Sequence, residues 1–151
     1  MKTALNSLLL LVIWLAASGF TASAADSNQF WPALQSGVQI VLLRHALAPG
    51  TGDPAGFNFN DCAPQRNLSA TGREQARKIG ELFRGNGIDS ARVCSSQWCR
   101  CLETARLLEL GPVTELPIIN SFFQSFHRKE RQTRQLTEGL INKTSHSRWC
   151  W

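Results

Sequence analysis

Short apolar runs alternate with segments of helical pattern along the middle of this 151-residue chain, and this alternation restricts the fold most. The apolar runs have the length and composition of buried strands; they are residues 40–43, 91–94 and 113–119. The segments with helical spacing of apolar residues are 71–84, 97–110 and 129–142. Strands that alternate with helices pair in parallel, with helices covering both faces of the sheet. We therefore predict an α/β domain, a three-layer sandwich with a mostly parallel sheet.

The first of these helices has both of its ends marked in the sequence. Thr71 and Glu74 have the spacing of a capping box, in which each side chain pairs with a backbone N–H group of the first turn. The run Gly85-Asn86-Gly87 ends the helix. Its buried stripe is expected to consist of Ala76, Ile79, Gly80 and Phe83.

Polar and charged residues follow two of the predicted strands at the point where each strand ends. Arg44 and His45 come directly after the first apolar run, and Ser95 and Ser96 follow the second, with Arg100 about one turn into the next helix. The carboxyl ends of parallel strands form one edge of a sheet, where ligands bind, so these side chains should lie together. Two guanidinium groups, an imidazole and the N-terminus of a helix at one edge predict a phosphate site.

A long segment rich in glycine, proline and asparagine, residues 46–67, connects the first predicted strand to the first helix. Connections of this length are uncommon unless they are functional. We therefore expect this segment, which contains Asp53, to line or cover the phosphate site.

Three sequence motifs occur in the same order as in a known enzyme family. They are Leu43-Arg44-His45; Asn67-Leu68-Ser69 with Gly72 and Gln75-Ala76; and Ser95-Ser96 with Arg100 and Thr104-Ala105. On these motifs, the stretch 39–105 resembles the histidine phosphatases, which are phosphoglycerate mutase-like. Asp53-Pro54, Asp61-Cys62 and the run 65–69 look closest to the bacterial exported branch of that family.

The resemblance implies a role for four of these residues. His45 would be the nucleophile that takes up the phosphoryl group as phosphohistidine, which water then hydrolyses. Arg44 and Arg100 would neutralise the phosphoryl oxygens, and Ser95 either contacts the phosphate or only caps the following helix. The implied function is a phosphomonoester hydrolase that acts on a small phosphorylated substrate without a metal or other cofactor.

The sequence departs from the family pattern at residues that complete the site. Ala46 stands where the family usually has a glycine after the histidine. The run 121–124 contains no carboxylate where the family commonly has its proton donor, so Asp53 is the candidate for that acid. The family's second histidine is not assigned here, because His127 and His146 both lie in polar or charged runs.

We expect residues 25–151 to form a partial histidine phosphatase domain, which lacks the C-terminal strand and the second histidine and is impaired in activity. Two alternatives stay open: a non-catalytic protein that binds phosphate or sugar phosphates, and an inactive frameshifted product. The frameshift has a basis in the genetic code. Read two bases later, the codons of Trp149-Cys150-Trp151 followed by any stop codon encode Val-Leu-Val, which has the composition of a strand.

The first 24 residues have the pattern of an export signal. Lys2 precedes the apolar stretch 5–17, and Ala22-Ser23-Ala24 is a small-residue cleavage site. The apolar stretch is shorter than the roughly 20 residues that span a bilayer. We expect cleavage without stable membrane insertion, an uncleaved anchor being the alternative, and a mature protein that is periplasmic or secreted.

The formal net charge of +5 favours anionic partners. Apart from the cluster 127–131, the basic residues are scattered, as on an ordinary solvated surface. The sequence therefore does not favour nucleic acid as a partner, and it leaves the oligomeric state open.

Five cysteines in a chain that we expect to be exported indicate disulfides, and the odd number leaves at least one of them unpaired. A zinc site is the alternative, but Cys99 and Cys101 are too close in sequence for the usual ligand spacing. A bridge from Cys62 to either Cys99 or Cys101 would hold the long segment against the site. Spacing alone does not choose between these pairings.

Overall fold

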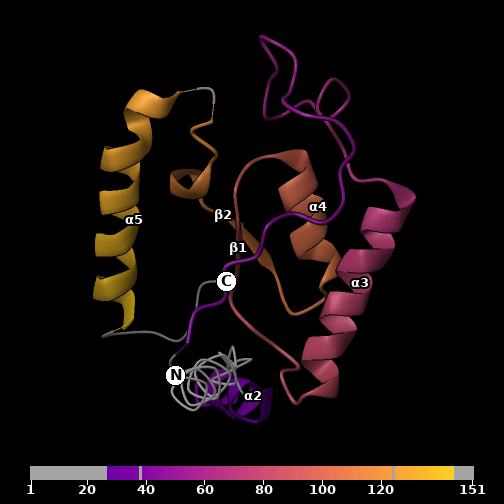
Figure 1. Ribbon diagram of the computed structural model, residues 1–151, viewed down its shortest axis with the longest axis vertical. Coiled ribbons are helices and arrows are strands. Elements are labelled where there is room, and N and C mark those ends of the chain that lie inside the picture. The colour runs from indigo at the N-terminus through magenta and orange to yellow at the C-terminus, as the bar shows by residue number, and fades with distance from the viewer. Residues whose placement is uncertain (1–26, 38, 124, 145–151) are drawn as a thin grey trace, which may run out of the picture. The chain divides into compact units, whose positions relative to one another are not determined.

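A computed structural model describes residues 27–37, 39–123 and 125–144 of the chain (Figure 1). The predicted export signal, Gln124, His146 and the C-terminal run 149–151 lie outside these residues. The chain divides into two compact units, residues 1–30 and 31–151, and the candidate site belongs to the second unit. None of the helices described is long and apolar enough to cross a membrane.

The three helices predicted from the sequence are confirmed, and among the described residues one further helix, α2, precedes them. The elements are α2 (Ser27–Gln35), α3 (Ala70–Gly85), β1 (Val93–Ser95), α4 (Cys99–Leu107), β2 (Val113–Glu115), the 3₁₀ helices η1 (Pro117–Ile119) and η2 (Phe126–Arg128), and α5 (Lys129–Thr144). Helix α4 is shorter than predicted at both ends. Its C-terminus is followed by Glu109, which has a positive φ of 53° and cannot continue a right-handed helix.

The sheet of the described residues consists of β1 and β2, which pair in parallel as predicted, with Val93 opposite Val113 and Ser95 opposite Glu115. Strand β2 ends earlier than predicted. Leu116 still donates its N–H to the carbonyl of Ser95, but Pro117 has no N–H group with which to extend the ladder and instead begins η1.

Residues 40–43, predicted as the first buried strand, do not form a strand. The backbone groups of residues 39–45 make no hydrogen bond to any residue that the structure describes, so there is no ladder. Val41 packs against the core, whereas Leu42 and Leu43 are 77% and 49% exposed. An apolar run is buried on both faces only where both faces are covered, and here the described residues cover only the side of Val41.

Helix α3 begins one residue earlier than predicted and has a different cap. The N-cap is Ser69, whose hydroxyl accepts a hydrogen bond of 3.0 Å from the N–H group of Gly72. The predicted capping box of Thr71 and Glu74 is therefore wrong, because the hydroxyl two residues earlier occupies the cap position. The predicted stripe is confirmed: the buried residues are Gly72, Ala76, Gly80 and Phe83, and Ile79 packs against the core.

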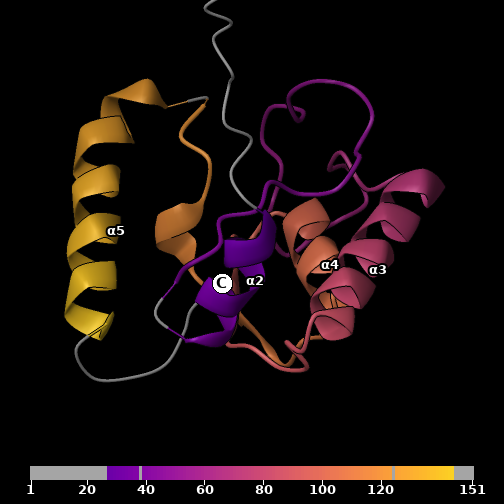
Figure 2. The same ribbon diagram turned by 60° about the horizontal axis from the view of Figure 1, so that its bottom comes forward.

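Helix α4 packs directly on both strands, and α3 packs on α4 from the other side (Figures 1 and 2). Gly80 permits this approach, because a Cβ atom at that position would overlap the carbonyl group of Leu108. The core of this layer consists of Leu34, Phe83, Ile88, Val93, Ala105, Leu108 and Leu110. Helix α5 packs on η1 and η2 instead, and a cavity lies between it and β1.

Candidate active site

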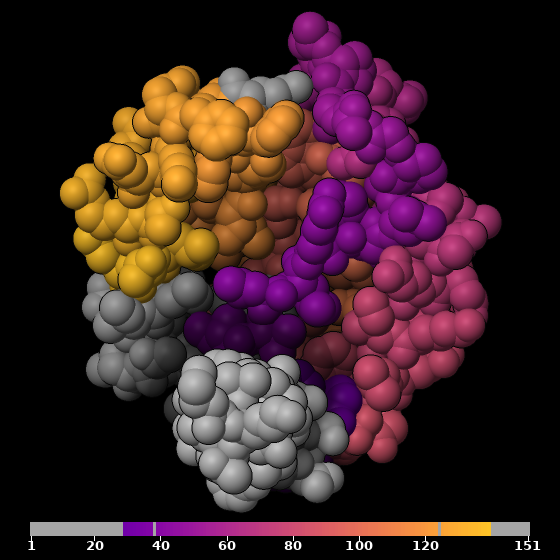
Figure 3. Space-filling model, in the orientation of Figure 1, coloured from indigo at the N-terminus to yellow at the C-terminus, as the bar shows by residue number. Residues whose placement is uncertain are grey.

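A cavity of about 760 Å³ opens where the predicted site residues come together. Its walls are the segment 41–45, part of the long segment 46–67, β1, the start of α4, η1 and the middle of α5. In Figure 3 the surface is hollowed between the orange segment that carries η1 and η2 and the purple segment around residue 45. Arg44, His45, Asp53, Ser95 and Arg100 all line it, so the structure brings together every residue predicted for phosphate chemistry.

His45 is held in a defined orientation at this cavity. Its ring atom Nδ1 lies 2.7 Å from the carbonyl oxygen of Ala46. A carbonyl oxygen can only accept, so Nδ1 carries the proton and donates it in this hydrogen bond. The other ring nitrogen, Nε2, then has its lone pair available for a ligand in the cavity.

The surroundings of His45 favour its neutral form. Partial burial lowers the pKa of His45 below its ordinary value of 6.5, and the positive charges of Arg100, Arg66 and Arg44 lower it further. The hydrogen bond to Ala46 acts in the opposite direction but does not reverse the shift in pKa. An uncharged imidazole with a free lone pair is the state in which histidine is a nucleophile.

The backbone after His45 is fixed by side chains of the two helices. Ala46 donates its N–H to the hydroxyl of Thr104 in α4, and Leu47 donates its N–H to Oε1 of Gln75 in α3, both at 3.0 Å. Leu47 in turn accepts a hydrogen bond from the N–H group of Ser69 at the start of α3. These contacts set the position of His45 although no strand precedes it.

Arg100 is buried in the first turn of α4, with a side chain 8% exposed. Its Nη1 donates to both carboxylate oxygens of Asp53, at 3.0 and 2.9 Å, and its guanidinium carbon lies 4.5 Å from the centre of the Trp98 ring. The Nε–H group of Arg100 is buried and has no hydrogen-bond partner among the described residues. A buried donor of this kind is costly unless it gains an acceptor, and a phosphate oxygen is one.

Arg66, which belongs to the long segment 46–67, is the third arginine that lines the cavity, and sequence reasoning did not single it out. Its Nη1 donates to the carbonyl oxygens of Ala48 and Gly50, and its Nε–H group is also buried without a partner among the described residues. The sequence carried one signal for it: Arg66 stands within the run 65–69 that resembles the family.

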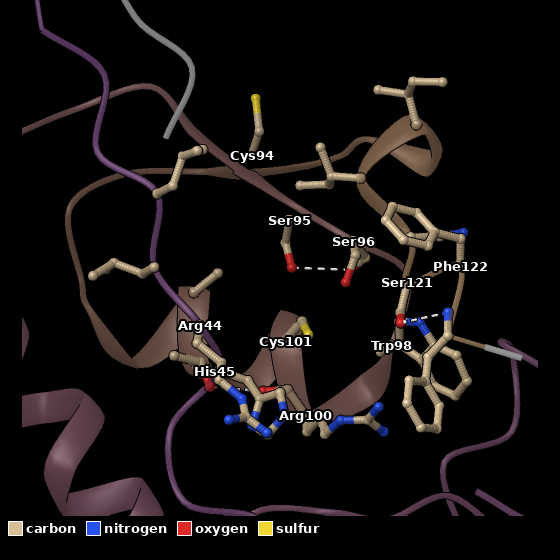
Figure 4. A pocket seen from close by; sticks show the side chains of 18 of the residues that line it. Arg44, His45, Cys94, Ser95, Ser96, Trp98, Arg100, Cys101, Ser121 and Phe122 are labelled. Atoms are coloured by element: carbon tan, nitrogen blue, oxygen red, sulfur yellow. Dashed lines mark hydrogen bonds between the residues drawn. The ribbon is translucent and has the colours of Figure 1, made fainter. Parts of the chain in front are cut away.

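Arg44 and Ser95 differ in their exposure and in their hydrogen-bond partners. Arg44 is exposed at the rim and makes no hydrogen bond or ion pair with any described residue. Ser95 is buried, and its hydroxyl donates to the carbonyl oxygen of Ser96 at 2.9 Å. Figure 4 shows Arg44, His45 and Arg100 at one side of the cavity, with Ser95 and Ser96 facing its middle.

The N-terminus of α4 does not present its N–H groups to the cavity in the way that the sequence suggested. The helix begins at Cys99 rather than directly after Ser96, and Trp98 is its N-cap. Cys99 donates its N–H to Oε1 of Gln65, and Cys101 donates to the carbonyl of Trp98. Because these donors are already engaged, the positive charge of the site comes from guanidinium groups rather than from the helix terminus.

One disulfide joins the long segment to α4, between Cys62 and Cys99. Of the two pairings left open by the sequence, this is the one present. Cys101 is a free thiol, and burial raises its pKa although its hydrogen bond with Ser96 lowers it somewhat. Among the described residues, no three His, Cys, Asp or Glu side chains gather as a metal site.

A comparison with known protein families identifies the family of this chain. The family model of the histidine phosphatase superfamily (branch 1) matches residues 40–121, which is more than half of the chain. Among solved structures, SixA from Agrobacterium tumefaciens, described as a phosphohistidine phosphatase, matches with 24% identity and a TM-score of 0.36. That match covers 49% of this chain and 44% of SixA, so the chain spans less than half of that protein. None of the curated proteins compared matches the chain.

Proposed function

The chain belongs to the histidine phosphatase superfamily (branch 1), and from this premise we propose that it hydrolyses small phosphomonoesters through a phosphohistidine on His45. The family and the α/β fold class expected from the motifs are confirmed. The identity of the nucleophile and the roles of its neighbours are the proposal.

The orientation of His45 carries the proposal. The hydrogen bond from Nδ1 to Ala46 leaves Nε2 unprotonated, and a pKa below 6.5 keeps the ring neutral at physiological pH. Nε2 is therefore a nucleophile before any substrate binds, with no need of a separate base.

The phosphoryl group would be held by guanidinium groups around this nitrogen. Arg44 has its charge unpaired among the described residues, and Arg100 and Arg66 each have a buried Nε–H group without an acceptor there. A dianionic phosphate supplies both the opposite charge and the acceptors. Ser95 lies at the same cavity and would add a hydroxyl contact.

The reaction has two steps. Nε2 of His45 attacks phosphorus in line as the bond to the ester oxygen breaks, and the arginines stabilise the charge on the transferring group. The leaving oxygen takes up a proton from water in the cavity, because both oxygens of Asp53, the acid suggested by the sequence, already accept hydrogen bonds from Arg100. Water then attacks the phosphohistidine and releases inorganic phosphate, which restores the neutral imidazole.

Phosphoenzyme trapping tests this function. The protein is mixed with a ³²P-labelled aryl phosphate, and label that is stable to base and labile to acid is assigned to a residue by mass spectrometry. We expect label on His45 in the wild type and none in His45→Ala. His127→Ala is the matched control, since His127 is exposed in η2 and does not line the cavity. Hydrolysis that survives in His45→Ala at the wild-type rate contradicts the proposal.

One observation favours a non-catalytic alternative. Both oxygens of Asp53 are occupied as acceptors by Arg100, and one of them also accepts from the N–H group of Arg66. Without a proton donor, the site would bind phosphate or a sugar phosphate without cleaving it. Phosphate binding by the wild type with no phosphohistidine over many hours would identify that case.

We also propose that the protein acts in the periplasm or is secreted. The proposal is supported by the apolar stretch and the small-residue cleavage site in residues 5–24, and the Cys62–Cys99 disulfide fits an oxidising compartment. N-terminal sequencing of protein recovered from a bacterial periplasm is expected to begin at Ala25. Recovery of the uncut chain from the cytoplasm contradicts export.

A further inference from the structure

Asp53 and Arg100 come from different parts of the chain and form a buried ion pair at the cavity. We propose that Asp53 is a positioning residue, which holds the Arg100 guanidinium in the orientation that receives the phosphate. The inference rests on the proposed function and gives Asp53 a role different from that of proton donor.

The geometry of the pair is that of a fixed contact. Both carboxylate oxygens of Asp53 accept from Nη1 of Arg100, and the two side chains are 3% and 8% exposed. Charge-assisted hydrogen bonds away from water are strong and directional, and the loss of one partner leaves the other charge buried and unpaired. The orientation of Arg100 therefore depends on Asp53.

The Trp98 ring contacts the same guanidinium group, with its centre 4.5 Å from the guanidinium carbon. A cation over an aromatic face is attracted to it, so Trp98 and Asp53 together restrict the rotation of the Arg100 side chain. Its Nε–H group is buried without a partner among the described residues, and its Nη2 group makes no hydrogen bond to them either. These donors are left for the oxygens of a phosphate.

Asp53 is itself held by its own segment. Its Oδ1 accepts a hydrogen bond of 2.8 Å from the backbone N–H group of Arg66. The side chain of Arg66 donates to the carbonyl oxygens of Ala48 and Gly50, at 3.0 and 2.6 Å. The stretch 48–53 is thus held by hydrogen bonds to Arg66. These bonds fix the position of the Asp53 carboxylate independently of its contact with Arg100.

The same segment is attached to α4 at the two residues that precede Arg100. Cys99 forms the disulfide with Cys62, and Trp98 stacks on Phe57 with ring centres 4.3 Å apart. Trp98, Cys99 and Arg100 are therefore all in contact with the long segment 46–67. Such a set of contacts fixes the distance between Asp53 and Arg100 more closely than the ion pair alone.

Substitution of Asp53 tests the role, with inorganic phosphate as the probe. Asp53→Asn keeps the size of the side chain and an acceptor for Arg66 but removes the charge. We expect inorganic phosphate to bind about 10- to 100-fold more weakly, since the loss of one hydrogen bond to a charged group has effects of that order. Asp61→Asn is the matched control on the same segment, because Asp61 is exposed and its carboxylate accepts only from the N–H group of Ala63.

A double-mutant cycle shows whether Asp53 acts through Arg100. In the Arg100→Lys background, which lacks the guanidinium group, Asp53→Asn is expected to weaken phosphate binding by less than a further twofold. If the loss of phosphate affinity in the double variant equals the product of the losses in the two single variants, the inference is overturned. Tighter phosphate binding by Asp53→Asn also overturns it, because the carboxylate would then act only by repelling the anion.

Leaving-group dependence separates positioning from proton donation. A positioning residue is needed equally for aryl and alkyl phosphates, whereas a proton donor is needed mainly for alkyl phosphates, whose leaving oxygen is strongly basic. We expect Asp53→Asn to lower kcat/KM by the same factor for both substrates. A loss confined to the alkyl phosphate assigns Asp53 as the acid and overturns the inference.

Two measurements keep this inference distinct from the proposed function. A wild type that binds phosphate but forms no phosphohistidine removes the hydrolase function, while the phosphate-binding cycle still decides the role of Asp53. The Nε–H signal of Arg100 in ¹⁵N NMR spectra is expected to be protected from hydrogen exchange in wild type and Asp61→Asn, and to lose protection in folded Asp53→Asn. Unchanged protection in Asp53→Asn overturns the inference without any reference to catalysis.

Discussion

The backbone N–H group of Ala46 donates a hydrogen bond of 3.0 Å to the hydroxyl of Thr104, across 58 residues of sequence. The same hydroxyl donates its proton to the carbonyl oxygen of Arg100 at 2.7 Å. The buried side chain of Thr104 thus connects Ala46, the residue after His45, to Arg100 in α4. The distance between His45, the proposed nucleophile, and Arg100, the proposed phosphate-binding residue, depends on this hydroxyl.

Replacement of Thr104 by valine is expected to impair both stability and activity. Valine has the same shape but no acceptor, so the buried N–H group of Ala46 loses its partner at a cost of about 1–3 kcal/mol in the free energy of unfolding. Phosphoenzyme formation should slow by about 10-fold as His45 loses its position. Urea denaturation and single-turnover labelling measure the two effects. Thr104→Ser keeps the hydroxyl and should restore both; a Ser variant as impaired as the Val variant contradicts the assigned role.

The acid limb of the pH profile for phosphoenzyme formation is expected below pH 6.5. Burial and the neighbouring arginines lower the pKa of His45, so its neutral form persists at a pH where an ordinary histidine is charged. Arg44→Gln removes one of these charges and should move the limb upward, even though the rate itself falls. A limb at or above pH 6.5 in the wild type contradicts this prediction.

The same shift in pKa links pH to the stability of the fold. Below pH 6.5 the unfolded chain binds a proton at His45 more readily than the folded chain does. The free energy of unfolding should therefore decrease as pH falls from 6.5 to the lowered pKa of His45. His45→Asn is expected to remove this part of the pH dependence, measured by urea denaturation at several pH values.

Gly72→Ala is expected to destabilise the protein and displace the nucleophile. A Cβ at Gly72 would overlap the carbonyl of Leu47, two residues after His45, and overpacking of this kind costs about 1–3 kcal/mol. Gly85→Ala in the same helix is the control, because no atom lies within 4 Å of the added Cβ. Thermal denaturation should show a loss for Gly72→Ala and none for Gly85→Ala; equal effects contradict the close approach.

Reduction of the Cys62–Cys99 disulfide is expected to lower the free energy of unfolding by about 2–4 kcal/mol, as the unfolded chain gains freedom. Cys62 is exposed, so dithiothreitol has access to the bridge. The measurement is urea denaturation with and without the reductant. The double variant Cys62→Ser/Cys99→Ser should be equally destabilised and insensitive to dithiothreitol. If dithiothreitol still lowers the free energy of unfolding of the double variant, the loss of stability does not come from this disulfide.

Local patterns predicted the helices well and the first strand badly. The stripe of α3 and the end of that helix are set by residues close in sequence, and they were predicted correctly. The burial of Leu42 and Leu43 depends instead on what lies against them, which an apolar run does not reveal. The cap of α3 was misassigned because Ser69 and Thr71 both offer a hydroxyl near the helix start.

The site was predicted where a sequence motif marks it, and missed where the fold of a long loop forms it. Arg44 and His45 belong to a motif although no strand precedes them in the structure, Arg100 lies in the first turn of α4, and all three line one cavity. Arg66 and the ion pair of Asp53 depend on how residues 46–67 return to α4, which is set by tertiary contacts. No spacing in the sequence encodes those contacts, and the choice of Cys99 over Cys101 as partner of Cys62 is of the same kind.

Residues 39–45 make no backbone hydrogen bond to the part of the chain that the structure describes, and this has a consequence for amide exchange with solvent. Protection should begin abruptly at Ala46 and Leu47, whose N–H groups are held by Thr104 and Gln75. The amide of His45 is thus expected to exchange readily with deuterium. The amide of Ala46, the next residue, is expected to exchange only when α3 and α4 move apart. The proposed nucleophile is thus anchored from the side of Ala46, and the stability of the two helices sets how long it stays aligned.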